Sequence, residues 1–236
     1  MAGILLAKLG VASRIIERDI TLSPLSKAIG IHARTLELFK LTDKDLFKRF
    51  EDESWENLSM RFYFGGNLTA DVSPIPSKDS EFTVPWMLMQ SRTVEILTEE
   101  YEKTGMGRVD RGWELYDTKV VEQEKAVENR EDGSVKATTT TTTTSWVETT
   151  IRRAIEGTNE RKGERDALGV VDMAAEDEDK QYVTKVVRSE YLIGADGGRS
   201  TVRHRLNIPF PGRTRDYNLI LFDGCVETEL STSSIA

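Results

Sequence analysis

The sequence of 236 residues is poor in the residues that build disulfide frameworks and metal centres. It contains one cysteine, Cys225, which excludes an internal disulfide and fits a reducing compartment. Its two histidines, His32 and His204, are far apart in the sequence and leave little material for a zinc site. These shortages argue against the disulfide-rich and the zinc-dependent classes of protein.

A long hydrophobic run and an excess of positive charge are missing as well. The apolar start, Met1–Ile16, is interrupted by Lys8 and Arg14 too early for a membrane span, and it lacks the cleavage pattern of a secretory signal. With 40 acidic and 32 basic residues the net charge is −8, which argues against a nucleic-acid surface. We therefore expect a soluble, cytoplasmic chain of one or two domains with a sizeable core.

The most informative stretch is Tyr191–Arg203, which reads YLIGADGGRSTVR. Its apolar start predicts a buried strand, its three glycines permit backbone angles that side chains forbid, and the hydroxyl of Ser200 or Thr201 can cap a new helix. A strand, a glycine turn and a helix start together present backbone N–H groups to an anion. Asp196 would then stand at the carboxyl end of the strand, where ligands of open α/β folds bind. For a bare Asp-Gly dipeptide, an ordinary strand–turn–helix junction is the alternative.

This run resembles the second flavin motif, GADG-x-RS-x-VR, of the class A FAD-dependent aromatic hydroxylases, the family of para-hydroxybenzoate hydroxylase and phenol 2-monooxygenase. The resemblance covers roughly residues 2–50, 82–128 and 182–226. It implies an α/β fold: an incomplete Rossmann-like FAD-binding domain, a β-meander and the start of a substrate-domain sheet. It also implies FAD as cofactor, NAD(P)H as reductant and a small aromatic substrate that is hydroxylated with dioxygen. In such enzymes the flavin carries the chemistry and the protein supplies position and electrostatics.

The N-terminal segment fits part of a dinucleotide-binding unit. Met1–Leu9 has helical spacing with a stop at Gly10, and Val11–Arg18 then predicts a strand that ends in the acidic residue Glu17. An acidic residue at this strand tip accepts hydrogen bonds from the adenosine ribose, although an exposed strand-end charge is the alternative. The resemblance makes Gly3 the third glycine of G-x-G-x-x-G, which lets helix and strand pack closely. The first strand and the first two glycines have no counterpart in this sequence, so we expect it to bind FAD weakly or not at all.

Ser23–Arg34 is similar to the loop in which the family places an arginine near the flavin phosphates. The resemblance places this role on Arg34. An arginine suits it because the planar guanidinium matches the geometry of phosphate oxygens. The alternative is an exposed arginine ahead of the predicted helix Thr35–Lys40. Thr42 and Asp45 then resemble a capping box for a helix that continues to Phe50.

A second helix is predicted over Gln90–Tyr101, with apolar residues along one face. Its run QSRTVEILTEEY is similar to a family segment whose glutamine contacts the flavin, which implies that role for Gln90 and a weaker one for Arg92. The resemblance also places Asp196 and Gly197 at the cofactor. Asp196 would accept hydrogen bonds from cofactor hydroxyls or orient its neighbours, and it would not shuttle protons.

The organisation along the chain follows from these segments. A partial FAD-binding βαβ region at 1–54 precedes short crossover strands and a helix at 55–110, where apolar runs alternate with glycines and prolines. A β-meander at 111–190 carries a low-complexity and acidic insertion at 137–180; the flavin motif with its helix occupies 191–213, and the start of a truncated substrate domain 214–236.

The meander is expected to contain the strands Trp113–Lys125, Ser134–Ile151 and Gln181–Ser189, the second of which includes seven consecutive threonines. The stretch Glu156–Lys180 is too poor in apolar residues to pack on a core. Leu219–Val226 is expected to be a strand of the substrate-domain sheet.

Two functions remain open from the sequence. The first is a FAD-dependent monooxygenase that hydroxylates a phenolic or other electron-rich small molecule of secondary metabolism. The second is a non-catalytic, truncated remnant of that family that binds a partner or a ligand. For the first, we predict that the strands 11–18 and 191–194 lie in one parallel sheet. Glu17, Arg34, Gln90 and Asp196 would then converge on one cleft.

Overall fold

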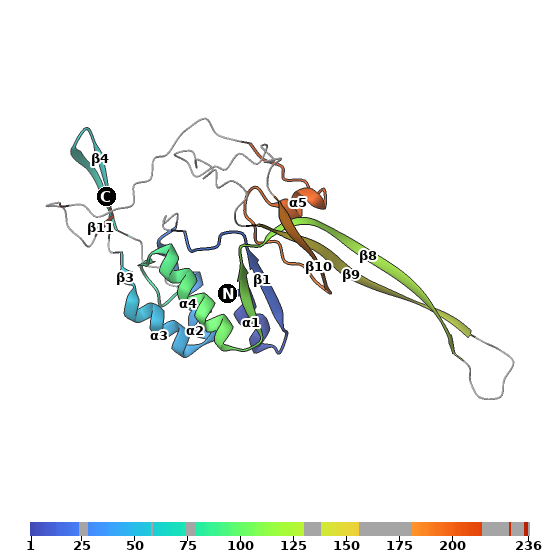
Figure 1. The fold of residues 1–236 in the computed structure, drawn as a ribbon. Coiled ribbons are helices and arrows are strands. Elements are labelled where there is room, and N and C mark those ends of the chain that lie inside the picture. Colours follow the sequence, from blue (N-terminus) through green and yellow to red (C-terminus); the bar gives the residue numbers. More distant parts are fainter. Residues whose placement is uncertain are drawn as a thin grey trace. The chain divides into compact units, whose positions relative to one another are not determined.

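The structure is a computed structural model that describes residues 1–23, 28–57, 59–73, 79–129, 138–155, 181–213, 227 and 234–235. Helices and strands both occur along the chain, as expected of an α/β protein (Figure 1). The chain divides into two compact units, the first formed by residues 1–15, 19–110 and 216–236 and the second by residues 16–18 and 111–215. Within the described ranges, no helix combines the length and the apolar character needed to cross a membrane.

Four helices build the core of the first unit: α1 (Ala2–Lys8), α2 (Ala33–Thr42), α3 (Lys44–Glu53) and α4 (Gln90–Lys103). Each contributes apolar side chains that are fully or almost fully buried, namely Ile4, Leu36, Phe39, Leu46, Phe50, Ile96 and Tyr101. The predicted helices at the N-terminus, after Arg34 and from Gln90 are thus confirmed. Their burial supplies most of the stabilisation, because isolated helices of this length are marginal in water.

The junction between α2 and α3 differs from the predicted capping box. Asp43 is the N-cap of α3, and its Oδ1 accepts hydrogen bonds from the backbone N–H groups of Asp45 at 2.9 Å and Leu46 at 3.1 Å. Thr42 instead ends α2 and donates its hydroxyl to the carbonyl of Leu38 at 2.6 Å. The predicted role of Thr42 is therefore wrong, because the aspartate beside it reaches two N–H groups and takes the cap.

The predicted strand after Gly10 is confirmed as β1 (Ser13–Glu17), which pairs with β7 (Gly107–Arg111). The N–H of Ser13 donates to the carbonyl of Met106, and the N–H of Trp113 donates to the carbonyl of Glu17, so the two strands run in the same direction. Gly10, with φ +77°, makes the turn between α1 and this strand.

Short strands between Trp55 and Pro85 are also confirmed. They belong to two three-stranded sheets of the first unit. One has the order β2-β6-β3, with β2 (Gly30–Ile31), β6 (Trp86–Met87) and β3 (Trp55–Glu56). The other has the order β11-β4-β5, with β11 (Ser234–Ile235), β4 (Ser59–Phe64) and β5 (Asn67–Val72).

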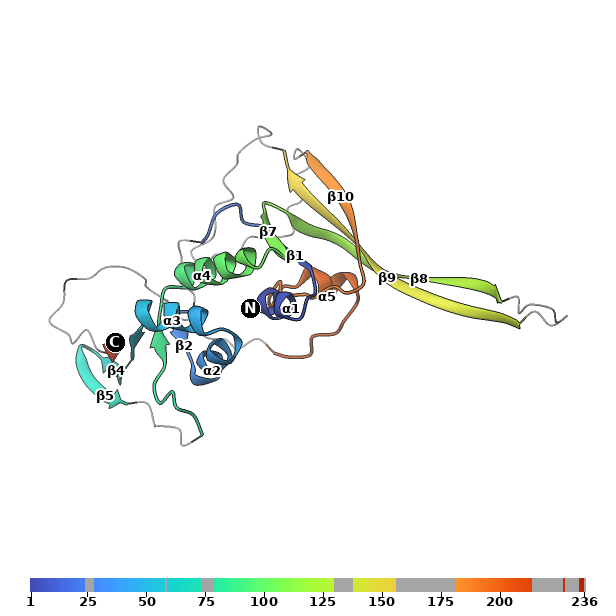
Figure 2. The same ribbon diagram turned by 90° about the horizontal axis from the view of Figure 1, so that it is seen from below.

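The second unit contains the predicted meander, formed by β8 (Glu114–Asn129), β9 (Thr138–Ala154) and β10 (Tyr182–Ser189). The central strand β9 is antiparallel to both neighbours, and β10 pairs only with its last eight residues, from Val147 to Ala154. The remainder of β8 and β9 extends past β10 as a two-stranded arm, visible in Figures 1 and 2. Residues 130–137, between β8 and β9, and the apolar-poor stretch 156–180 of the predicted insertion lie outside the described residues.

The strand predicted at the start of the flavin motif is wrong. Residues 191–197 have no regular secondary structure, and Tyr191 and Ile193 are 84% and 63% exposed. A run of three apolar residues without burial has no reason to join a sheet. The prediction that strands 11–18 and 191–194 lie in one parallel sheet is wrong as well, because β1 belongs to a two-stranded sheet with β7 and residues 191–194 form no strand. The predicted strand 219–226 lies outside the described part of the chain.

Candidate functional site

The segment Gly194–Ser200, here called the Asp196 turn, is organised by the aspartate at its centre. One carboxylate oxygen of Asp196 accepts a hydrogen bond from the hydroxyl of Ser200 at 2.5 Å, and the other accepts one from the backbone N–H of Val202 at 3.0 Å. Gly197 has φ +81°, in the left-handed region that favours glycine. The turn is therefore closed by its own side chains, and Asp196 orients its neighbours, one of the two roles expected of it.

Ser200 links the turn to the helix α5 (Thr201–Arg205). Its buried hydroxyl accepts a hydrogen bond from the N–H of Arg203 at 3.0 Å, so it caps the helix as one of the two predicted hydroxyls. A Cβ on Gly194 would lie 3.2 Å from the Cβ of Val202, so a glycine here lets the turn and the helix approach closely.

The charge of Asp196 is stabilised by these contacts. Partial burial by itself raises the pKa of its carboxyl, but the hydrogen bonds from Ser200, from the N–H of Val202 and from nearby backbone outweigh this effect and lower the pKa. Asp196 is accordingly an anion at neutral pH, held by hydrogen bonds from its neighbours.

Gly3 performs the packing expected of the third glycine. A Cβ at this position would lie 2.8 Å from Cε2 of Tyr101 on α4 and 3.1 Å from Cδ1 of Ile15 on β1. Only a glycine leaves room for α1, α4 and β1 to meet this closely. The Tyr101 hydroxyl then donates to the carbonyl of Ser13 at 2.6 Å and fixes α4 to β1. The sequence indicated Tyr101 only as the end of the predicted helix Gln90–Tyr101 and of its apolar face, so its role in holding β1 was missed.

Arg34 lies in the first turn of α2 with its side chain 90% exposed. Its guanidinium makes a 3.4 Å contact with Glu37, three residues further along the helix. An exposed ion pair of this length is weak, on the order of 0.5 kcal/mol or less. The guanidinium therefore remains available for a stronger anionic partner.

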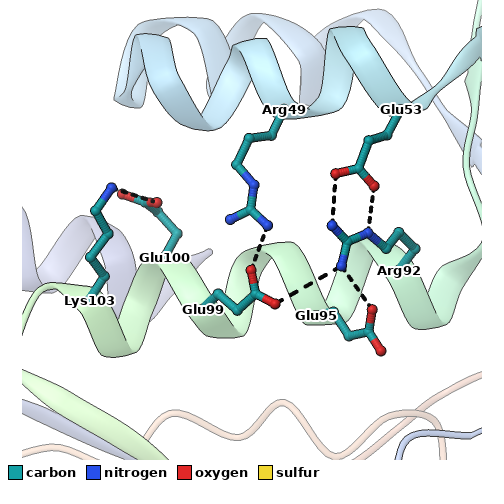
Figure 3. A network of polar contacts seen from close by, with 7 residues as sticks. All are labelled: Arg49, Glu53, Arg92, Glu95, Glu99, Glu100 and Lys103. Atoms are coloured by element: carbon teal, nitrogen blue, oxygen red, sulfur yellow. Dashed lines mark hydrogen bonds and ion pairs between the residues drawn. The ribbon is translucent and has the colours of Figure 1, made fainter.

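Arg92 lies among carboxylates of α3 and α4, and its predicted weaker role at the flavin stays a prediction. Its guanidinium forms a two-pronged ion pair with Glu53 at the end of α3, at 2.5 and 2.8 Å, and contacts Glu95 at 3.0 Å (Figure 3). The hydrogen bonds that Arg92 donates, to Glu53 first and then to Glu95, raise the pKa of Arg92, and Arg92 in turn lowers the pKa of Glu53. Glu99 joins the network by accepting from Arg49 at 2.5 Å. Arg92 thus connects α3 to α4, a role that its position in the sequence could not indicate.

Gln90 and Glu17 lie at the ends of elements, as predicted. Gln90 is the half-buried first residue of α4, and Glu17 is the exposed last residue of β1. The predicted cofactor residues fall into both units: the first contains Gly3, Arg34, Gln90 and Arg92, and the second contains Glu17, Asp196 and Gly197. Their convergence on one cleft stays a prediction.

The donor set suits FAD in part. Diphosphate needs cations and N–H donors, and a ribose needs a hydrogen-bond acceptor; Arg34 and Glu17 offer these groups on exposed side chains. Asp196 and Arg92 bond groups within the protein, and we treat them as candidates for shaping the site. Among the side chains that the structure describes, no group of three or more His, Cys, Asp and Glu is placed to hold a metal ion.

A helix packed through a glycine onto a strand, and a glycine turn closed at a helix start, are features typical of α/β proteins that bind dinucleotides. The chain belongs to the family described as FAD binding domain, whose model matches residues 1–147 and 149–234. The resemblance seen in the sequence motifs is thereby confirmed, together with the α/β fold and with FAD as the cofactor of the family.

Individual proteins match parts of the chain. A segment of 61 residues, 22% of this chain and 10% of the relative, is 41% identical to 3-(3-hydroxy-phenyl)propionate/3-hydroxycinnamic acid hydroxylase 1 of Burkholderia vietnamiensis. The fold is similar to that of the flavin-dependent monooxygenase PieE in complex with FAD and substrate, with a TM-score of 0.58 and 21% identity over 90% of this chain and 30% of that one.

A second solved structure, p-nitrophenol 4-monooxygenase PnpA from Pseudomonas putida, has a TM-score of 0.59 and 15% identity over 90% of this chain and 42% of that one. The likenesses in structure show a shared fold. The chain spans less than half of either solved structure and about a tenth of the curated relative.

Proposed function

We propose that this chain is the FAD-binding part of an NAD(P)H-dependent monooxygenase that hydroxylates a phenolic or other electron-rich aromatic molecule. The observation that carries the proposal is the Asp196 turn, whose aspartate, serine and glycines form a closed motif in a chain matched along nearly its whole length by the FAD-binding family. The names of the matched relatives, a hydroxylase of hydroxylated aromatic acids and two monooxygenases, support the substrate class.

Each proposed contact follows from the chemistry of one side chain. Arg34 would bind the diphosphate, Glu17 would accept hydrogen bonds from ribose hydroxyls, and Gln90 would donate or accept at the flavin. The Asp196 turn would present its backbone, held in one conformation by Ser200 and Val202. Bound FAD would supply the redox chemistry, by taking two electrons from NAD(P)H and activating dioxygen.

A titration with FAD tests the proposal at Arg34. Flavin fluorescence is followed while protein is added, over a range wide enough for weak binding, with riboflavin as the ligand that lacks diphosphate. Arg34→Gln should weaken FAD binding roughly tenfold, because a charge-assisted hydrogen bond contributes about 1.5–3 kcal/mol. It should leave the affinity for riboflavin unchanged.

Arg108→Gln is the matched control, because Arg108 is also an exposed arginine of the first unit with one carboxylate partner, Asp110 at 2.8 Å. This variant should bind FAD like the wild type. Failure of the wild-type chain to bind FAD at all would contradict the proposal and support the non-catalytic alternative. Equal losses in both variants would remove Arg34 from the site.

A further inference from the structure

Arg205, the last residue of α5, connects this helix to the meander. Its Nε donates a hydrogen bond to the backbone carbonyl of Tyr116 on β8 at 2.8 Å. Its guanidinium lies 5.3 Å from the centroid of the Tyr116 ring and 3.7 Å from the carboxylate of Asp117. One side chain thus combines a hydrogen bond, a cation–π contact and a weak ion pair with the same short stretch of β8.

The contact continues across the sheet. The guanidinium of Arg152 on β9 lies 4.6 Å from the ring of Tyr116 and 4.3 Å from the ring of Tyr182 on β10. Arg152 is held in place by an ion pair with Glu114 at 2.6 Å. Cations and rings therefore alternate from β10 to α5 in the order Tyr182, Arg152, Tyr116, Arg205, and we call these four residues the cation–aromatic ladder.

The helix α5 needs such an anchor because it has no buried residue of its own. Its ends are satisfied locally: Asp196 and Ser200 bond the N–H groups at the start. At the far end Asn207 has φ +53°, its N–H donates to the carbonyl of His204, and the N–H of Ile208 donates to the carbonyl of Arg203. This pattern is a Schellman motif. Such caps stabilise the helix but do not fix it against the sheet, which the ladder does.

We propose that Arg205 is a positioning residue for the cofactor: through the cation–aromatic ladder it holds α5, and with it the Asp196 turn, in a fixed place on the meander. The inference rests on the proposed function, since the turn matters only if it faces FAD. The cation–aromatic ladder, the helix α5 and the Asp196 turn all belong to the second unit. The coupling is direct, because Asp196 bonds the N–H of Val202 and Ser200 bonds that of Arg203, both within the helix that Arg205 anchors.

The test compares Arg205→Gln with Arg188→Gln. Arg188 is a matched control, because it also lies over a ring of the meander, Trp146 at 5.4 Å, and pairs with one carboxylate, Glu148 at 3.0 Å. Amide hydrogen exchange at Val202 and Arg203 reports on the turn without any cofactor. Arg205→Gln should speed their exchange about tenfold and weaken FAD binding by a similar factor, with little change in the thermal midpoint. Arg188→Gln should leave all three unchanged.

Two further variants guard against misfolding. Arg205→Lys keeps the charge but loses the planar group that stacks on a ring, so it should restore part of the protection. Tyr116→Leu removes the ring and keeps the carbonyl acceptor, so it should show a smaller increase in exchange than Arg205→Gln.

Unchanged exchange at Val202 and Arg203 in Arg205→Gln would overturn the inference. Faster exchange with unaltered FAD affinity would overturn its functional half. Absence of FAD binding by the wild-type chain would instead contradict the proposed function, and exchange alone would then decide whether the ladder holds the turn.

Discussion

At the scale of single residues, two features shape the local structure of this chain. One is a glycine that leaves space for close packing, and the other is a carboxylate that accepts hydrogen bonds from its neighbours. Gly3 leaves the space that Tyr101 and Ile15 need, and Asp196 gathers two donors from the segment that follows it. Both residues act through the local backbone. Their effects are therefore measurable in the protein without a cofactor.

Gly3→Ala is expected to destabilise the first unit by about 1–3 kcal/mol, because the added methyl meets the ring of Tyr101 at 2.8 Å. Urea unfolding measures the loss. Gly30→Ala is the control, since a Cβ there would make only ordinary contacts, at 3.8 Å from His32 and 3.9 Å from Met87. Equal stabilities for the two variants would show that α1 packs less tightly than described.

The charge of Asp196 predicts a pH dependence. Its pKa is lower in the folded chain than in the unfolded chain, so its contribution to stability is present above the unfolded pKa, near 3.9, and is lost as pH falls through the lower folded value. The difference in unfolding free energy between the wild type and Asp196→Asn should therefore shrink as the pH is lowered below about 4. Unfolding curves from neutral to acid pH would measure it. A difference that grows toward acid pH would contradict the assigned contacts.

At the scale of elements, the bidentate pair between Arg92 and Glu53 ties α4 to α3 (Figure 3). Glu53→Gln should cost about 0.5–1 kcal/mol, and the loss should shrink in 1 M salt, where the Debye length is about 3 Å. Glu81→Gln, which breaks the single exposed pair with Lys40 at 2.5 Å, should cost less. Thermal unfolding at low and high salt compares the two. An undiminished loss for Glu53→Gln in high salt would mean that packing, not charge, holds this contact.

At the scale of the whole molecule, the elements that follow from periodic and local sequence patterns could be predicted. The contacts between residues distant in the sequence could not. The helix from Gln90, the meander strands and the hydroxyl cap at Ser200 follow from spacing and residue type within a short window. The strand expected at Tyr191–Ile193 failed because three apolar residues do not reveal whether another strand will cover them.

The same limit applies to the candidate site. The motif indicated Asp196 and Gly197 as candidate cofactor residues. The bidentate ion pair of Arg92 with Glu53 and the hydrogen bond of Arg205 to Tyr116 instead join residues that are distant in the sequence. Ion pairing depends on which surfaces meet after folding, and a single sequence without its relatives carries no record of this.

The division of the chain into two units has a consequence for its folding. Residues 16–18 belong to the second unit, while the rest of that unit begins at residue 111, so the intervening polypeptide forms part of the first. Neither unit is a continuous stretch that can be excised whole. The second unit must close a long loop over an early piece of chain, a step that costs entropy and slows folding. Cleavage near residue 110 that releases residues 1–110 would therefore also remove residues 16–18 from the second unit.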